Sequence, residues 1–150
     1  MAKSFIKNAQ LAYAGAAVAA ASNTDDDSSV FDMQGFTHAV FFTTITDCAD
    51  TGVATLTVDT NTTSATGGTA VTGASAAATS AADDDLNGTF LAVEVANVLQ
   101  RYVYANRASA TANIAFGEIY CILHNGVERA AKVPLTAHST AATVDLQVDA

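Results

Sequence analysis

The sequence has no tryptophan, a single proline (Pro134) and only two cysteines, Cys48 and Cys121. It contains no C-x-x-C pair, and two thiols in such different surroundings do not make a metal-binding framework. Cys48 falls in a predicted turn and Cys121 in a predicted strand. We expect two free thiols, with Cys121 as a small buried hydrophobic residue, while the sequence leaves a disulfide open.

Basic residues are missing from most of the chain. No Lys or Arg occurs in residues 8–100, which hold eleven acidic residues, and the formal net charge is −9. An acidic surface repels phosphate, so we expect neither nucleic acid nor an anionic membrane as a partner. An acidic protein with a small basic patch is better suited to contacting one protein surface while it stays soluble.

Motifs of enzymatic chemistry are also missing: there is no G-x-S-x-G, no P-loop and no H-E-x-x-H. The three histidines are scattered, and His38 lies in an apolar strand, where a hydrogen-bonded core or interface histidine is expected. The acidic triplets at residues 25–27 and 83–85 lack the spacing, the glycine and the distal glutamate of an EF-hand loop. We expect solvated acidic turns, with Ca²⁺ at a subunit junction as the alternative, and we expect no enzyme, cofactor or metal site.

What the chain does contain is Thr, Ala, Ser and Gly in quantity, and half of its 150 residues are hydrophobic. Short strands with Thr/Ser/Gly-rich connections suit this composition, whereas long helices do not. Because many of the hydrophobic residues are Ala, the core must depend on fewer large side chains. Those we expect in it are Phe36, Phe41, Phe42, Phe90, Phe116, Leu56, Leu91, Ile45, Ile114, Ile119 and Ile122.

Apolar patterns predict eight or nine strands, the number of a jelly-roll sandwich. Residues 53–60 alternate cleanly, and residues 36–46 are apolar on both faces, which indicates a central strand or one whose outer face meets a partner. Residues 114–124 are predicted as one strand with Ile114, Phe116, Tyr120 and Ile122 on the same face. The other strands are predicted at residues 30–33, 69–72, 90–95, 101–107 and 143–148. The remainder of residues 61–82 is expected to be a loop.

The amino terminus allows two interpretations. Residues 1–11 are predicted to be an arm, and residues 12–22 a helix or a weak strand. Alternatively, Lys3 and Lys7 precede an Ala-rich run that ends in an A-x-A-like site at residues 19–21, which is the outline of a secretory signal peptide. We divide the chain into an N-terminal arm or edge segment (residues 1–22), a β-sandwich domain (residues 23–134) and a C-terminal tail or strand (residues 135–150).

The basic residues that remain are the candidate site. Arg presents a planar fork of donors that suits carboxylates, and Arg and Tyr are common anchors at protein interfaces. The alternative is that each Arg pairs with a carboxylate of its own chain. The candidate interface residues are Lys3, Lys7, Arg101, Tyr102, Tyr104, Arg107, Arg129 and Lys132.

Several segments carry a resemblance to a known family. Val-Phe-Asp-Met-Gln-Gly-Phe (residues 30–36) precedes a long apolar strand and a Thr/Gly-rich middle. Asn-Gly-Thr-Phe-Leu-Ala-Val-Glu-Val (87–95), Gln-Arg-Tyr-Val (100–103) and Glu-Ile-Tyr-Cys-Ile-Leu (118–123) follow. Over residues 30–134 this layout resembles small virion proteins of tailed bacteriophages, the capsid cement or decoration proteins. Members commonly carry more basic charge around the Arg-Tyr element than this chain does.

The resemblance implies an all-β, jelly-roll-like sandwich with an extended N-terminal arm and a C-terminal tail. It also implies a homotrimer in the virion, assembled in the host cytoplasm and bound to the major capsid protein where capsomers meet. The apolar second face of residues 36–45 and the strand at residues 143–148 would then be subunit surfaces. The alternative is a secreted or surface-displayed β-domain, pilin-like or an adhesin module, with residues 1–21 as its signal peptide.

Overall fold

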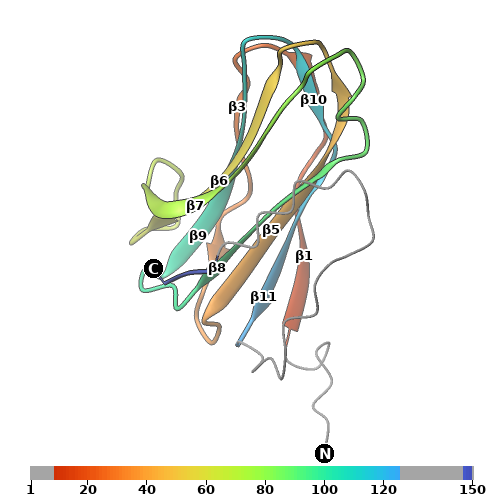
Figure 1. The fold of residues 1–150 in the computed structure, drawn as a ribbon. Helices are drawn as coiled ribbons and strands as arrows, with labels where there is room; N and C mark the ends of the chain where they lie inside the picture. Colours follow the sequence, from red (N-terminus) through yellow and green to blue (C-terminus); the bar gives the residue numbers. More distant parts are fainter. Residues whose placement is uncertain (1–8, 126–146, 150) are drawn as a thin grey trace, which may run out of the picture.

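The structure is a computed structural model of the chain, and it describes residues 9–125 and 147–149. Within these residues the fold is all-β: two sheets pack face to face as a jelly-roll-like sandwich (Figure 1). No described segment forms a helix long and apolar enough to cross a membrane. The predicted fold class is therefore confirmed.

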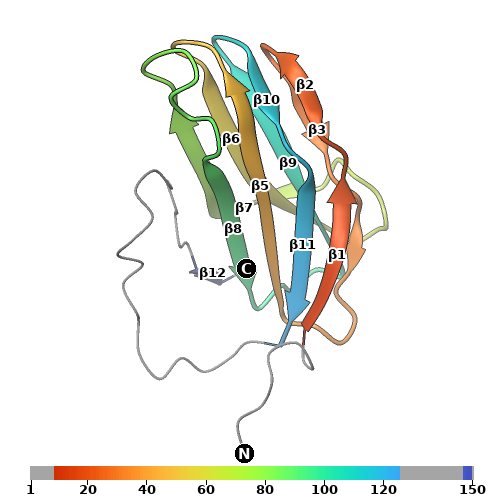
Figure 2. The same ribbon diagram turned by 90° about the vertical axis from the view of Figure 1, so that its right-hand side faces the viewer.

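The larger sheet has seven strands arranged around the long strand β5 (His38–Cys48). On one edge of β5 lie β11 (Ile119–His124) and then β10 (Ile114–Phe116), and on the other lies β8 (Phe90–Ala96). β1 (Ala9–Gly15) pairs with β11, and β2 (Val18–Ala21) with β10. β12 (Gln147–Asp149) adds to β8 in parallel, and Figure 2 shows β8, β5, β11 and β1 side by side.

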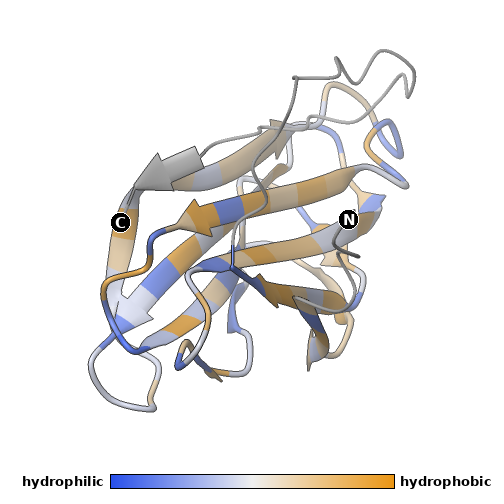
Figure 3. Cartoon of the chain, turned by 90° about the horizontal axis from the view of Figure 1, so that it is seen from below, coloured by the Kyte–Doolittle hydropathy of each residue, from blue (hydrophilic) through white to orange (hydrophobic). Residues whose placement is uncertain are grey.

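The smaller sheet has five strands. β3 (Asp25–Asp27), β9 (Tyr102–Ala110), β6 (Val53–Asn61) and β7 (Thr69–Thr79) follow in that order, and β4 (Phe31–Asp32) also pairs with β9. Strand β6 shows the predicted alternation, since Ala54, Leu56 and Val58 are fully buried. Apolar and polar residues alternate along the strands in this way in both sheets (Figure 3). This period of two places one face of each strand in the core.

The core between the sheets contains most of the large residues expected there. Seven of them are buried to below 2% exposure: Phe41, Phe116, Leu56, Leu91, Ile45, Ile114 and Ile119. Phe36 is partly buried and packs against this core. The prediction is wrong for Phe42 and Ile122, which are only partly buried, and for Phe90, which is 52% exposed. These three residues lie on the outer face of the larger sheet.

Two strand predictions need correction. Residues 114–124 are not one strand, because β10 and β11 are separated at Gly117 and Glu118. The register is irregular there, and a one-residue slip moves side chains to the other face of a sheet. As a result Ile114, Phe116 and Ile119 all face the core. Tyr120 and Ile122 lie on the outer face. Residues 69–79 form the full strand β7, and its core side is made of Ala74, Ala76 and Ala78.

The segment from Ala9 to Ala21 is part of the larger sheet. Ala14 is fully buried, and its carbonyl accepts a hydrogen bond from the amide of Ser29 at 2.7 Å. The described residues 9–22 thus form edge strands, neither a free arm nor a helix. Cleavage after residue 21, as in the signal-peptide alternative, would remove both β1 and β2.

Both cysteines are free and buried, as expected for Cys121. Cys48 is the last residue of β5, where a turn was predicted, and its sulfur accepts a hydrogen bond from the amide of Leu86 at 3.4 Å. Burial raises the pKa of the Cys121 thiol to about 12. A thiolate at this position would lie in the apolar core without compensation.

This burial predicts a loss of stability in alkali. The folded pKa of Cys121 lies above the unfolded one, so the unfolded chain releases its proton first as the pH rises. The stabilisation should be complete below about pH 9 and should disappear toward pH 12, by roughly 4 kcal/mol in all. Urea unfolding of the wild type and of Cys121→Ala at pH 8 to 11 measures this. An equally steep decline in both proteins would contradict it.

Candidate docking surface

The outer face of the larger sheet carries a contiguous group of apolar and aromatic side chains. Cross-strand register places Tyr13, Tyr120 and Phe42 in one row over β1, β11 and β5, and Leu11, Ile122 and Val40 in the next. Phe90 of β8 lies opposite Thr44 on the same face. We call this group the outer aromatic face: Leu11, Tyr13, Val40, Phe42, Phe90, Tyr120 and Ile122.

The exposure of this face is unusual for aromatic and large aliphatic residues. Leu11 is 67%, Tyr13 55% and Phe90 52% exposed. The rings also contact one another: Phe42 and Tyr120 stack with centroids 5.6 Å apart, and Tyr13 meets the edge of Tyr120 at 5.9 Å. Such contacts fix the ring positions in advance, which lowers the entropy lost when a partner binds.

A shallow hollow of about 180 Å³ lies within the outer aromatic face. Phe42, Phe90, Tyr120 and Glu118 are among the residues that line it. The Tyr120 hydroxyl donates a hydrogen bond to the Glu118 carboxylate, and this bond raises the pKa of Tyr120. The hollow therefore offers apolar walls with one carboxylate at the rim, an arrangement that suits an aliphatic side chain with a neighbouring donor.

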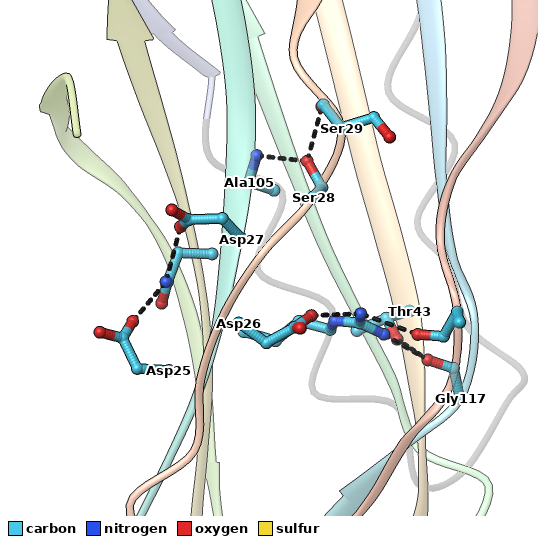
Figure 4. Close-up of polar contacts among 11 residues, drawn as sticks. Asp25, Asp26, Asp27, Ser28, Ser29, Thr43, Ala105 and Gly117 are labelled. Carbon is cyan, nitrogen blue, oxygen red and sulfur yellow. Dashed lines mark hydrogen bonds and ion pairs between the residues drawn. The ribbon is translucent and has the colours of Figure 1, made fainter. Parts of the chain in front are cut away.

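The opposite outer face, on the smaller sheet, is polar and acidic. Asn106 of β9 donates from its side-chain amide nitrogen to Asp25 at 2.5 Å and to Asp27 at 2.9 Å. The two aspartates are labelled in Figure 4. Beside Asn106 in the sheet lies Thr57 of β6, and Thr55 follows on the same face. The molecule is therefore two-sided, with apolar residues concentrated on one outer face and carboxylates on the other.

Of the predicted interface residues, Arg101 and Tyr102 are at the surface. The Arg101 guanidinium forms a forked ion pair with Asp32, with Nη2 to Oδ2 at 2.8 Å, and lies 5.4 Å from the centroid of the Tyr102 ring. Hydrogen bonding to Arg101 lowers the pKa of Asp32. Leu99, just before this corner, is 86% exposed.

Tyr104 and Arg107 were expected at the same corner, but both are 1% exposed, and the structure corrects that expectation. Tyr104 is on the outer face of the smaller sheet, where the connection between β6 and β7 covers it. Its hydroxyl donates to Asp59 at 3.1 Å and accepts from the amide of Gly68 at 2.7 Å. Burial raises the pKa values of both Tyr104 and Asp59.

Arg107 lies between the two sheets, where it joins several elements. Two of its partners, Asp26 and Gly117, are labelled in Figure 4. Its guanidinium donates to the carbonyl of Gly117 at 2.7 Å, to that of Ala16 at 2.8 Å and to Asp26 at 2.5 Å. Ala16 follows β1 and Gly117 follows β10, so both carbonyls belong to breaks between strands. Arg107 donates hydrogen bonds to carbonyl groups at the points where the strand ladders are interrupted. This is the internal pairing expected as the alternative.

Four predicted interface residues, Lys3, Lys7, Arg129 and Lys132, lie outside the described residues. The acidic segments differ from expectation, because residues 25–27 form strand β3 and its Asp26 is tied to Arg107. In the second triplet, Asp85 accepts from the amide of Ala81 at 2.8 Å, and this bond lowers its pKa. Among the described residues no group of three or more His, Cys, Asp or Glu is arranged to hold a metal ion.

His38, expected to be a hydrogen-bonded core or interface residue, is the first residue of β5. Its ring stacks on that of His124 with centroids 4.9 Å apart, and its Nδ1 lies 2.8 Å from the Thr37 hydroxyl. His124 in turn lies 3.1 Å from a carboxylate oxygen of Glu94. This polar cluster lies at one end of the outer aromatic face, on strands β5, β8 and β11.

Comparison with known proteins finds no matching protein-family model and no matching curated protein. Among solved structures, a chain of the structure of infectious bursal disease virus Gx strain aligns with 81% of this chain at 12% identity and a TM-score of 0.28. The alignment covers 31% of that viral chain, so the present chain spans about a third of its length. At this TM-score the match does not establish a shared fold.

Proposed function

We propose that this protein is a structural component of a virion, a capsid cement or decoration protein that binds the shell of the major capsid protein through its outer aromatic face. The observation that carries the proposal is the exposure of Leu11, Tyr13 and Phe90 on one sheet face. Contiguous exposed apolar residues with a polar surround are typical of protein-binding surfaces. The layout of residues 30–134 supports a shell as the partner, because it resembles the cement family.

The two-sided surface suits attachment to a shell. The outer aromatic face can be buried against another protein, while the acidic face of the smaller sheet with Asp25, Asp27 and Asn106 stays hydrated. Tyr13 is of a residue type that often dominates binding energy, and Phe90 is of a type enriched at the cores of interfaces. Binding of this kind needs no reacting groups.

Cement action requires more than one attachment per bound unit. We propose a homotrimer that spans neighbouring capsomers, so that separating them requires breaking several attachments at once. Attachments that are individually weak then stabilise the head. The exposed corner of Leu99, Arg101 and Tyr102 is the candidate for a second contact, because Tyr102 belongs to the smaller sheet whereas the outer aromatic face is on the larger one.

Polar substitution on the outer aromatic face tests the proposal. Tyr13→Ser with Phe90→Ser should weaken binding to purified shells by at least about thirtyfold, since even one interface hot spot contributes about 2 kcal/mol or more. Co-sedimentation of the protein with shells that lack it measures the affinity. Both side chains are more than half exposed, so the unfolding midpoint should change little.

The matched control is a cross-strand pair on the other outer face, Thr55→Ser with Ala77→Ser in β6 and β7. We expect wild-type binding from it. Equal loss of binding in both double variants would contradict docking through the aromatic face, and wild-type protein that stays monomeric at high concentration and does not bind shells would contradict the proposed function.

A further inference from the structure

The C-terminal strand β12 covers one open edge of the larger sheet. Its residues Gln147, Val148 and Asp149 pair in parallel with Glu94, Val95 and Ala96 of β8. β12 also lies against β7 of the smaller sheet, so it closes one side of the sandwich. Without it, this edge of β8 would be unpaired beside the buried Leu91, Val93 and Val95, and an unpaired edge is a template for another strand.

The connection to β12 is much longer than the path within one sheet requires. Strands β11 and β12 are separated by β5 and β8, which is three strand spacings or roughly 14 Å. Residues 126–146 join them, and a stretch of that length can span up to roughly 70 Å. A domain of this size has a diameter of roughly 40 Å. The same connection can therefore reach the equivalent β8 edge of an adjacent molecule.

Charge favours a second copy of this chain as that molecule. Within the described residues the only Lys or Arg side chains are Arg101 and Arg107, and both are ion-paired with Asp. Most of the remaining charged groups there are carboxylates, among them Asp25, Asp27 and Glu94. The connection to β12 carries Arg129 and Lys132. A basic connection is attracted to the acidic body of a neighbouring copy, and this attraction steers the C-terminal strand toward it.

We infer that the C-terminal strand is exchanged between copies of this chain: β12 of one molecule pairs with residues 94–96 of β8 in the next, in the same parallel register. Each molecule then both donates a strand and accepts one. Such head-to-tail exchange closes into a ring when the rotation between copies allows it. The exchange requires no shell and is therefore independent of the proposed capsid binding.

Engineered disulfides distinguish exchange from pairing within one chain. Glu94→Cys and Gln147→Cys place thiols at register partners in β8 and β12. One variant carries both substitutions, and two single variants carry one each. One of the single variants has a size tag, so that a heterodimer can be recognised on a gel. The two single variants are unfolded together, refolded as a mixture and mildly oxidised. Cys48 and Cys121 are buried and do not interfere under native conditions.

Exchange predicts a disulfide-linked heterodimer from the mixed single variants and intermolecular cross-links from the double variant on a non-reducing gel. Thr55→Cys mixed with Gln147→Cys is the control for random oxidation, since Thr55 lies on the opposite outer face, and it should give only background heterodimer. A double variant that cross-links only within single chains, with no heterodimer from the mixture, would overturn the inference. Absence of any cross-link would overturn it too, because β12 would then not pair with β8.

Discussion

Arg107→Met is expected to lower the free energy of unfolding by about 2–4 kcal/mol, because it removes a buried guanidinium and leaves its carbonyl partners without that donor. Arg107 is 1% exposed and donates to Asp26, Ala16 and Gly117. Methionine fills much of the same space but donates no hydrogen bond. The carbonyl of Ala16 would be left without its side-chain donor, and Gly117 would keep only the hydroxyl of Thr43, at 3.1 Å.

Arg101→Met is the matched control for this prediction. Arg101 also pairs with an aspartate, Asp32, but its side chain is 57% exposed. Exposed ion pairs contribute little because water solvates both charges when the pair is broken. Urea unfolding should therefore show a large shift of the midpoint for Arg107→Met and almost none for Arg101→Met. Similar shifts for both would show that Arg107 does not join the two sheets as described.

Deletion of residues 1–21 is expected to abolish cooperative folding. It removes β1 and β2, exposes the edges of β11 and β10, and takes away the Ala16 carbonyl that Arg107 binds. The fully buried Ala14 is lost with them. The net stability of a domain is only about 5–15 kcal/mol, so the loss of two edge strands exceeds what the rest can absorb.

Deletion of residues 1–8 is the control, because it stops before β1 begins at Ala9. Circular dichroism and thermal unfolding of both truncated chains measure the difference. The shorter deletion should keep a cooperative transition, whereas the longer one should lose it. A cooperative transition with an unchanged midpoint after removal of residues 1–21 would instead support cleavage of a signal peptide.

The all-β fold and the strands with large apolar residues could be predicted from local pattern alone. Strand β6 is the clearest case, since Ala54, Leu56 and Val58 alternate with Thr residues and are all buried. Strand β7 was expected to be much shorter because its buried residues are alanines. An Ala-rich strand has no contrast in side-chain size, and only its pairing with β6 shows that it continues to Thr79.

The candidate site was harder to predict because it depends on contacts that are distant in sequence. Arg107 and Asp26 are 81 positions apart, and nothing near Arg107 in the sequence indicates a buried carboxylate. The glycine at position 117 likewise has a tertiary cause: a Cβ there would lie 2.2 Å from the Thr44 hydroxyl. The apolar second face of β5 was expected from a central strand or from one whose outer face meets a partner. The structure shows β5 at the centre of its sheet, with the rings of Tyr13 and Tyr120 on the same outer face.

Electron cryomicroscopy of shells that lack this protein, before and after its addition, tests the central claim most directly. We predict added density where capsomers meet, with β1, β11, β5 and β8 turned toward the shell and the outer aromatic face buried against it. The acidic face with Asp25 and Asp27 should point toward solvent. Shells without added density, or density in which the smaller sheet contacts the shell and the aromatic rings are exposed, would contradict the proposal.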